Sequence, residues 1–96
     1  MINITQRGWQ YILRHHTGTQ FTRHKSKSKF YSTINLVNLI NQAASCPPSA
    51  CKDNLQRIFD AGYAVGIDRN TGKPTSIVSV FTRHNGDLIT MFPGRR

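Results

Sequence analysis

Apolar residues near the start of the chain recur at the spacing of a helix. Within residues 4–16, Trp9, Ile12 and Leu13 return to one side of a helix that has 3.6 residues per turn. Thr17-Gly18 follows them as a stop signal, because glycine readily adopts the backbone conformation that ends a helix. We therefore predict an amphipathic helix that ends near residue 16.

A second helix is predicted after a polar, basic loop. Residues 19–29 have no apolar period and predict the loop. Ser32 or Thr33 can cap the next helix, and Pro47-Pro48 ends it, since proline lacks the amide proton that a helix interior needs. Its apolar stripe is expected to comprise Ile34, Val37, Ile40 and Ala44, with Leu36 and Leu39 on the flanks.

The second half of the chain changes to the pattern of β-strands. Residues 63–67 and 75–83 predict strands, whereas residues 55–59 fit a strand or a helix. Asn85-Gly86 is the strongest hairpin signal, and residues 87–92 supply the return strand. Two helices followed by an antiparallel meander predict one α+β domain over residues 1–96, with the N-terminal helices packed on a small antiparallel β-sheet.

The hairpin defines two faces of the predicted sheet. A two-residue loop would fix six pairs across the hairpin: His84 with Asp87, Arg83 with Leu88, Thr82 with Ile89, Phe81 with Thr90, Val80 with Met91 and Ser79 with Phe92. One face would then hold the core residues Val78, Val80, Ile89 and Met91. The other face is expected to be open, so that rings stack on RNA bases and arginine pairs with phosphate; the alternative is a half-covered sheet with scattered polar residues. This second face would carry Ser79, Phe81, Arg83, Leu88, Thr90 and Phe92.

The charge of the chain points to a polyanionic partner. Thirteen Lys and Arg residues stand against four acidic residues, all Asp, which gives a formal net charge of +9. Nucleic acid is the commonest polyanion, and charge kept for solubility is the alternative. Each Asp stands alone in the sequence, which argues against a two-carboxylate glycosidase and against a carboxylate-caged metal. No apolar run approaches the roughly 18 residues of a membrane-spanning helix.

Two cysteines, Cys46 and Cys51, flank a proline-containing loop. Metal binding would need two further ligands, and the sequence has neither a Cys-x-x-Cys motif nor two histidines at the spacing of metal ligands. A local disulfide and two buried thiols both fit the spacing, and either reading makes the pair structural.

Two neighbouring histidines suggest chemistry on RNA. His16 falls on the stripe of Trp9 and Ile12, and His15 turns toward Tyr11. A histidine at a helix C-terminus can give or take a proton near neutral pH, although a lone histidine on an apolar stripe is often a hydrogen-bonded core residue. RNA carries its own nucleophile, the 2′-hydroxyl, so its cleavage needs only a base, an acid and positive charge around the phosphorus. The products would be a 2′,3′-cyclic phosphate and a 5′-hydroxyl end.

These considerations assign candidate roles without any metal or cofactor. Either histidine is a candidate base or acid, cations would stabilise the developing charge, and a hydroxyl would bind a phosphate oxygen. The basic loop would grip phosphates, although such a run is also typical of a solvated loop. The catalytic candidates are His15, His16, Lys27, Thr90 and Arg83, and the RNA-binding candidates are Arg23, Lys25, Ser28, Lys29, Phe81 and Phe92.

The order of four short motifs resembles that of a toxin family. The motifs are residues 11–16 (YILRHH), 27–30 (KSKF), 65–67 (VGI) and 85–93 (NGDLITMFP). They are similar to those of the small C-terminal RNase toxins of bacterial polymorphic systems, among them the contact-dependent growth inhibition (CdiA) toxins. Many of these belong to the barnase–EndoU–colicin–RelE (BECR) group, whose fold has N-terminal helices followed by a small antiparallel sheet.

The resemblance implies a site, a substrate and partners. It places the family histidine on His16, next to His15, the family lysine and serine on Lys27 and Ser28, and the family threonine on Thr90. It also implies cleavage of tRNA, neutralisation by a cognate immunity protein, and export as the C-terminal part of a large carrier that delivers the toxin into the cytoplasm of a target cell. The charge of the chain leads us to expect an acidic immunity protein.

Two other functions are compatible with the sequence. One is a non-catalytic RNA- or DNA-binding module that uses the same basic loop and aromatic face. The other is a metal-dependent nuclease in which His84, Asp87 and a further Asp hold the ion, although two ligands alone do not make a site.

Overall fold

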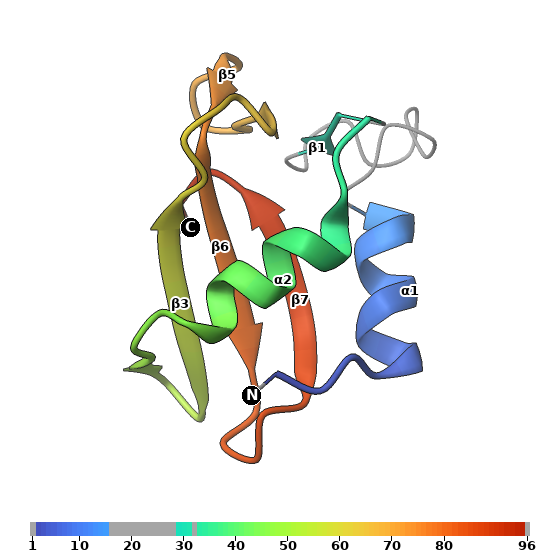
Figure 1. Ribbon diagram of the computed structural model, residues 1–96, viewed down its shortest axis with the longest axis vertical. Coiled ribbons are helices and arrows are strands. Elements are labelled where there is room, and N and C mark those ends of the chain that lie inside the picture. The colour runs from blue at the N-terminus through green and yellow to red at the C-terminus, as the bar shows by residue number, and fades with distance from the viewer. Residues whose placement is uncertain (1, 16–28, 32, 96) are drawn as a thin grey trace.

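The described part of the chain forms a small α+β domain with two helices and two antiparallel sheets (Figure 1). The computed structural model describes residues 2–15, 29–31 and 33–95, with the backbone alone for residues 14 and 15. The predicted α+β class is confirmed. The elements are α1 (Gln6–His15), β1 (Lys29–Phe30), α2 (Leu36–Ala44), β2 (Ser49–Cys51), β3 (Asn54–Asp60), β4 (Gly66–Ile67), β5 (Pro74–Thr75), β6 (Ile77–Thr82) and β7 (Leu88–Pro93).

The larger sheet carries the core. Its strand order is β2-β3-β6-β7, and α2 crosses its front while α1 runs beside β7 (Figure 1). Strands β1, β4 and β5 make the second sheet, which lies near the end of β7 that is remote from the hairpin turn. Apolar side chains of both helices and of the sheet's front form one buried cluster, whose members include Ile12, Leu39, Ile40, Val78, Val80 and Met91.

The second helix begins later than predicted. Asn35, rather than Ser32 or Thr33, caps α2, because its side-chain oxygen accepts a hydrogen bond from the amide of Asn38 (3.0 Å). The later start turns a different stripe toward the sheet, formed by Leu39, Ile40 and Ala43. The predicted stripe is therefore wrong for Ala44 and for Val37, whose side chain is 42% exposed.

The strands differ from the prediction at two places. The ambiguous residues 55–59 lie within β3, between β2 and β6. The predicted strand 63–67 is reduced to Gly66–Ile67, and the predicted strand 75–83 is divided because β5 belongs to the smaller sheet and β6 to the larger one. The chain thus changes sheets at Ser76, so one continuous β-branched run serves two sheets.

The final hairpin has a three-residue loop instead of the predicted two-residue loop. The amide of Arg83 donates to the carbonyl of Asp87 (2.9 Å), and that of Gly86 donates to the carbonyl of Arg83 (3.0 Å). Gly86 has φ of 96°, the left-handed conformation that the last residue of such a loop requires. Arg83 therefore faces Asp87, and the predicted pairs His84–Asp87, Arg83–Leu88 and Thr82–Ile89 are wrong.

A β-bulge then restores the predicted register. Thr82 pairs with Leu88, whereas Phe81 pairs with Thr90, so Ile89 is the extra residue. The predicted pairs of Phe81, Val80 and Ser79 are confirmed. The bulge exchanges the faces of two residues: Leu88 is 3% exposed in the core, and Ile89 is half-buried outside it.

Candidate functional site

The start of the chain is attached to the hairpin by a series of hydrogen bonds. Asn3 forms an isolated parallel bridge with Asp87, in which its amide donates to Gly86 (2.8 Å) and its carbonyl accepts from Leu88 (2.8 Å). The hydroxyl of Thr5 donates to the carbonyl of Leu88 (2.9 Å) and accepts from the amide of Gly8 (3.1 Å), which caps the start of α1. These bonds fix the first turn of α1 against β7.

Gly8 allows α1 to come this close. A Cβ at this position would overlap the carbonyl oxygen of Leu88 and lie 2.9 Å from its carbonyl carbon. Real Cβ atoms essentially never come within 3.0 Å of such atoms, so only glycine fits here. The position of α1, and of every residue on it, thus depends on the absence of a side chain at Gly8.

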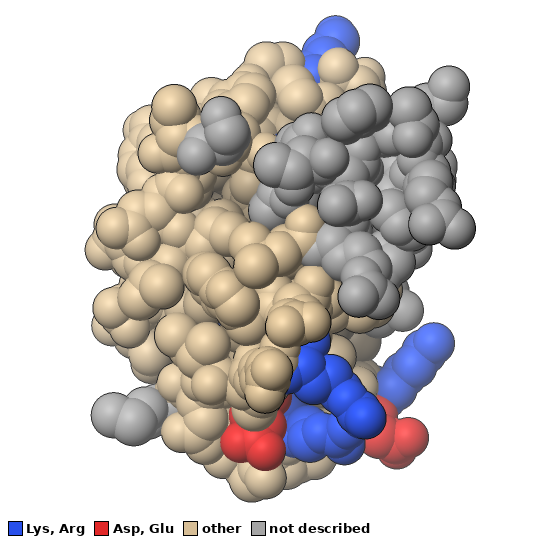
Figure 2. Space-filling model, turned by 90° about the vertical axis from the view of Figure 1, so that its right-hand side faces the viewer, with Lys and Arg blue, Asp and Glu red and all other residues tan. Residues whose placement is uncertain are grey.

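A hollow of about 290 Å³ lies between α1 and the hairpin. Two arginines from distant parts of the chain, Arg7 and Arg83, line it together with Tyr11, which is 40% exposed. Figure 2 shows this side of the molecule, with Lys and Arg side chains gathered at the hairpin end beside acidic ones. The remaining lining residues are Thr5, Gly8, Asp87, Leu88 and Ile89.

The two guanidinium groups at the hollow are available to an anion. Both arginines are exposed, and within the described part of the chain neither side chain forms an ion pair or a hydrogen bond. The carboxylate of Asp87 instead accepts from the side-chain amides of Asn3 (3.2 Å) and Asn85 (3.4 Å). The hollow therefore holds two unpaired positive charges against one negative charge that is already hydrogen-bonded.

The rear face of the hairpin, which points away from α2, carries Ser79, Phe81, Thr90 and Phe92. The rings of Phe81 and Phe92 stack with their centroids 5.7 Å apart, and Ser79 donates to the carbonyl of Gly94 (2.6 Å). The hydroxyl oxygen of Thr90 is buried without a hydrogen-bond partner among the described residues. A buried hydroxyl in this condition loses its hydration with no compensating bond.

The expectation that this face is open is wrong for its central residues. Phe81 is only 5% exposed and Ser79 is fully buried, because each lies on an inner strand between β3 and β7 and packs or bonds to its neighbours there. The ring of Phe81 cannot stack on a base in this conformation. Phe92 is half-buried, and Arg83 alone of the predicted face is exposed.

The other predicted site residues lie on α1, on β1, or outside the described residues. His15 is the last residue of α1, with its backbone alone described. Lys29 is half-buried in β1, in the smaller sheet rather than beside the hairpin. The predicted residues outside the described part are His16, Arg23, Lys25, Lys27 and Ser28.

Sequence reasoning did not single out Arg7, and used Tyr11 only as a neighbour of His15. The signal that could have found them is helical spacing: Arg7, Tyr11 and His15 are each four residues apart, so their Cα atoms follow one side of α1 over about 12 Å. Arg7 and Tyr11 line the hollow, which places the Cα of His15 further along the same side of α1.

A buried arginine on the front of the sheet was also not predicted. Arg57 on β3 is 8% exposed, and its Nη1 donates to the hydroxyl of Thr82 (3.2 Å). Its Nε is buried without a partner among the described residues. The period-two pattern assigns residue 57 to the core face, where a cation is unexpected.

Two further findings concern metals and cysteines. Among the described residues, no three His, Cys, Asp or Glu side chains lie close enough together to hold a metal ion. Cys46 and Cys51 are free and half-buried, and the thiol of Cys46 donates to the carbonyl of Gln42 (3.7 Å).

Neither of the described helices is long and apolar enough to cross a membrane. Comparisons of the chain with protein-family models, with curated proteins and with solved structures found no match.

Proposed function

We propose that this protein is a metal-independent ribonuclease. The observation that supports it most is the convergence of Arg7 and Arg83, which form no ion pair within the described part of the chain, on one hollow beside α1, the helix that ends at His15. Cations that bind the RNA backbone, together with an imidazole, are the minimal equipment for cleavage of RNA through its own 2′-hydroxyl.

The proposed reaction is an internal transfer at phosphorus. One imidazole, of His15 or His16, takes the proton of the 2′-hydroxyl as the new bond from O2′ to phosphorus forms. The bond from phosphorus to O5′ breaks, and an acid, which the second imidazole supplies, returns a proton to the departing O5′. Lys27 or Arg23 stabilises the negative charge that grows on the phosphoryl oxygens. The products are a 2′,3′-cyclic phosphate and a 5′-hydroxyl end.

Thr90 enters this scheme under a condition. Its hydroxyl has no partner among the residues that the structure describes and could donate to a phosphate oxygen, but it is buried, so neighbouring side chains must move before RNA reaches it. Substitution of Thr90 alone, and of each histidine alone, would distinguish its role in the reaction from theirs.

The biological role that we propose follows from the motif resemblance. The domain would adopt a BECR-like arrangement and act as an interbacterial toxin that cleaves tRNA after delivery by an exported carrier into the target-cell cytoplasm. A cognate immunity protein with an acidic surface would neutralise it, and the strength of that complex would fall as salt rises.

The test is cleavage of total bacterial RNA by the purified protein in excess EDTA, with mapping of new 5′-hydroxyl ends. Cleavage that EDTA leaves unchanged, with cyclic phosphate ends enriched in tRNA, supports the proposal. Cleavage that EDTA abolishes would replace it with a metal-dependent nuclease, and intact RNA in a measurable complex would replace it with a binding module. His16→Ala, His15→Ala and Thr90→Ala then identify the catalytic groups, and full activity in all three would contradict the site assignment.

A further inference from the structure

We infer that the hollow between α1 and the hairpin binds one backbone phosphate of the RNA away from the bond that is cleaved, held by Arg7 and Arg83. The inference rests on the proposed function and deepens it, because it makes the substrate a strand that extends beyond the reacting nucleotides. A nucleotide fragment without this second phosphate would bind more weakly.

Geometry separates the hollow from the proposed chemistry. Arg7 lies in the first turn of α1 and His15 at its end, about 12 Å apart along the axis. The hollow therefore lies at the start of α1, where Arg83 of the hairpin also lines it, whereas the proposed chemistry belongs to the other end of the helix. A single strand that follows this side of α1 would pass both positions.

The chemistry of the lining favours a phosphate. Guanidinium groups match the oxygens of a phosphate in a planar, two-bonded geometry, and these two have no other anion among the described residues. They come from opposite ends of the chain, so the fold assembles the pair, and the bonds of Asn3 and Thr5 to the hairpin fix it. The half-exposed ring of Tyr11 adjoins them and offers a surface to a neighbouring ribose or base.

Asp87 allows a second test, in which a substitution should strengthen RNA binding instead of weakening it. It lines the hollow, and its charge opposes the binding of any anion there. Asp87→Asn removes that charge and keeps an amide oxygen that accepts from Asn3. If the hollow holds phosphate, this substitution tightens RNA binding, whereas loss of Arg7 weakens it.

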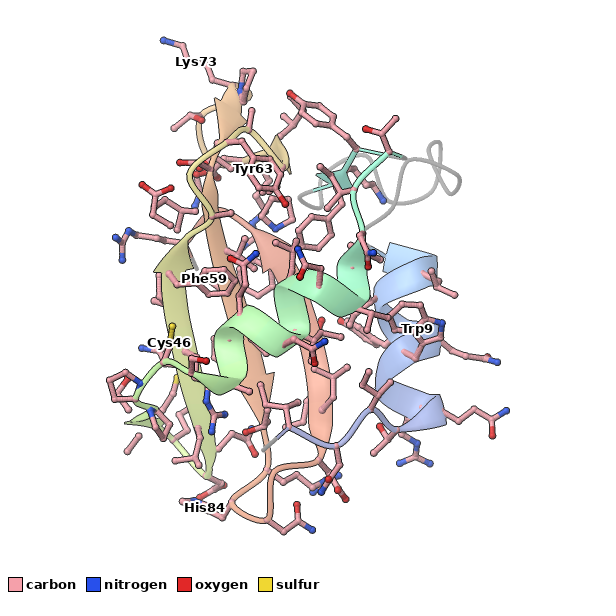
Figure 3. The ribbon with its side chains drawn as sticks, viewed as in Figure 1. Trp9, Cys46, Phe59, Tyr63, Lys73 and His84 are labelled. Atoms are coloured by element: carbon pink, nitrogen blue, oxygen red, sulfur yellow. The ribbon has the colours of Figure 1, made fainter. Side chains whose placement is uncertain are left out.

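The experiment measures binding of a fluorescein-labelled, 2′-O-methylated RNA oligonucleotide, which cannot be cleaved because its nucleophile is blocked. Affinity is determined by fluorescence anisotropy over a range of salt concentrations for the wild type, Arg7→Gln and Asp87→Asn. The matched control is Lys73→Gln, which removes the same charge from an exposed residue at the opposite end of the molecule from the hairpin residue His84 (Figure 3). Thermal unfolding of each variant confirms that it is folded.

Arg7→Gln is expected to weaken binding roughly fivefold or more and to reduce the slope of log affinity against log salt by about 0.7, the value for one phosphate contact on a single strand. Lys73→Gln is expected to change the affinity less than twofold, and Asp87→Asn to raise it. Equal effects of Arg7→Gln and Lys73→Gln would overturn the inference, as would weaker binding by Asp87→Asn. If the wild type binds the oligonucleotide in this pattern but cleaves no unmodified RNA, the ribonuclease proposal fails and the phosphate site stands; if it cleaves RNA and Arg7→Gln binds like the control, the reverse holds.

Discussion

Replacement of Gly8 by alanine tests whether close packing of α1 on β7 builds the site. On helix propensity alone the substitution should stabilise the protein by about 0.5–1 kcal/mol, because alanine loses less backbone freedom than glycine. The structure predicts the opposite sign. The new Cβ would meet the carbonyl group of Leu88 and come within 3.0 Å of the hydroxyl of Thr5.

The magnitude follows from what has to move. The obstructing atoms belong to the backbone of β7, so relief requires a shift of α1 as a whole, and overpacking of this kind costs about 1–3 kcal/mol. After the propensity gain is subtracted, we expect a net loss of about 0.5–2 kcal/mol, which corresponds to a drop in Tm of up to roughly 15 °C for a domain of this size. The shift also displaces Arg7 and Tyr11 from the hollow, so RNA affinity should fall with stability.

Urea denaturation followed by circular dichroism measures the free energy of unfolding of Gly8→Ala. The matched control is Gln10→Ala, which changes an exposed residue of the same helix and should stay within about 0.5 kcal/mol of the wild type. If Gly8→Ala is as stable as this control, the close approach of α1 to Leu88 is wrong, and the position assigned to Arg7 is wrong with it.

Three further predictions concern polar side chains. Thr82→Val keeps the shape of the side chain but removes the acceptor of the buried Arg57, so chemical denaturation should show a loss of about 1.5–3 kcal/mol. Thr90→Val removes a hydroxyl that has no partner among the described residues, so its free energy of unfolding should equal or exceed that of the wild type while RNA cleavage falls; lower stability would mean that the hydroxyl is bonded. Hydrogen bonds from the amide of Gly62 and from Ser76 lower the pKa of Asp60. The charged carboxylate therefore stabilises the fold at pH values above the ordinary pKa of an aspartate, and this stabilisation is lost as the pH falls through the lowered pKa. Asp60→Asn should therefore differ from the wild type in stability near pH 6 and converge with it in strong acid, and a difference that persists there would contradict the role of the charge.

The sequence predicted the elements better than their boundaries, for reasons that particular residues illustrate. Trp9 and Ile12 identified α1 because a helix that packs on the core needs apolar residues at helical spacing, and this spacing is visible in the sequence. The start of α2 was missed because Ser32, Thr33 and Asn35 are all good caps, and only packing on the sheet selects one of them.

The hairpin shows a limit of register arguments. The Asn-Gly signal located the turn, but it fits both a two-residue loop and the three-residue loop that ends in a left-handed glycine. The error of one residue was cancelled by the bulge at Ile89, so the pairs of Phe81, Val80 and Ser79 were right although the loop was wrong. A bulge leaves no mark in the alternation of a six-residue strand, so this compensation was not readable from the sequence.

Only the part of the candidate site that lies on a single helix could be predicted from the sequence. The row of Arg7, Tyr11 and His15 is a matter of helical spacing, whereas its meeting with Arg83 depends on the bonds of Asn3 and Thr5 to the hairpin. No local pattern in the sequence brings Arg7 and Arg83, which are 76 positions apart, to the same hollow.

The distribution of charge favours a binding function over mere solubility. A charge excess kept for solubility should be spread over the surface, since any exposed position serves that purpose equally. Residues 30–51, which include α2 and the exposed Val37, hold no Lys, Arg, Asp or Glu at all. In contrast, Arg7 and Arg83 line one hollow at the hairpin end, where the single negative charge of Asp87 offsets only one of their two positive charges. Solubility alone gives no reason to place both charges beside one hollow, whereas the proposed phosphate site requires them there.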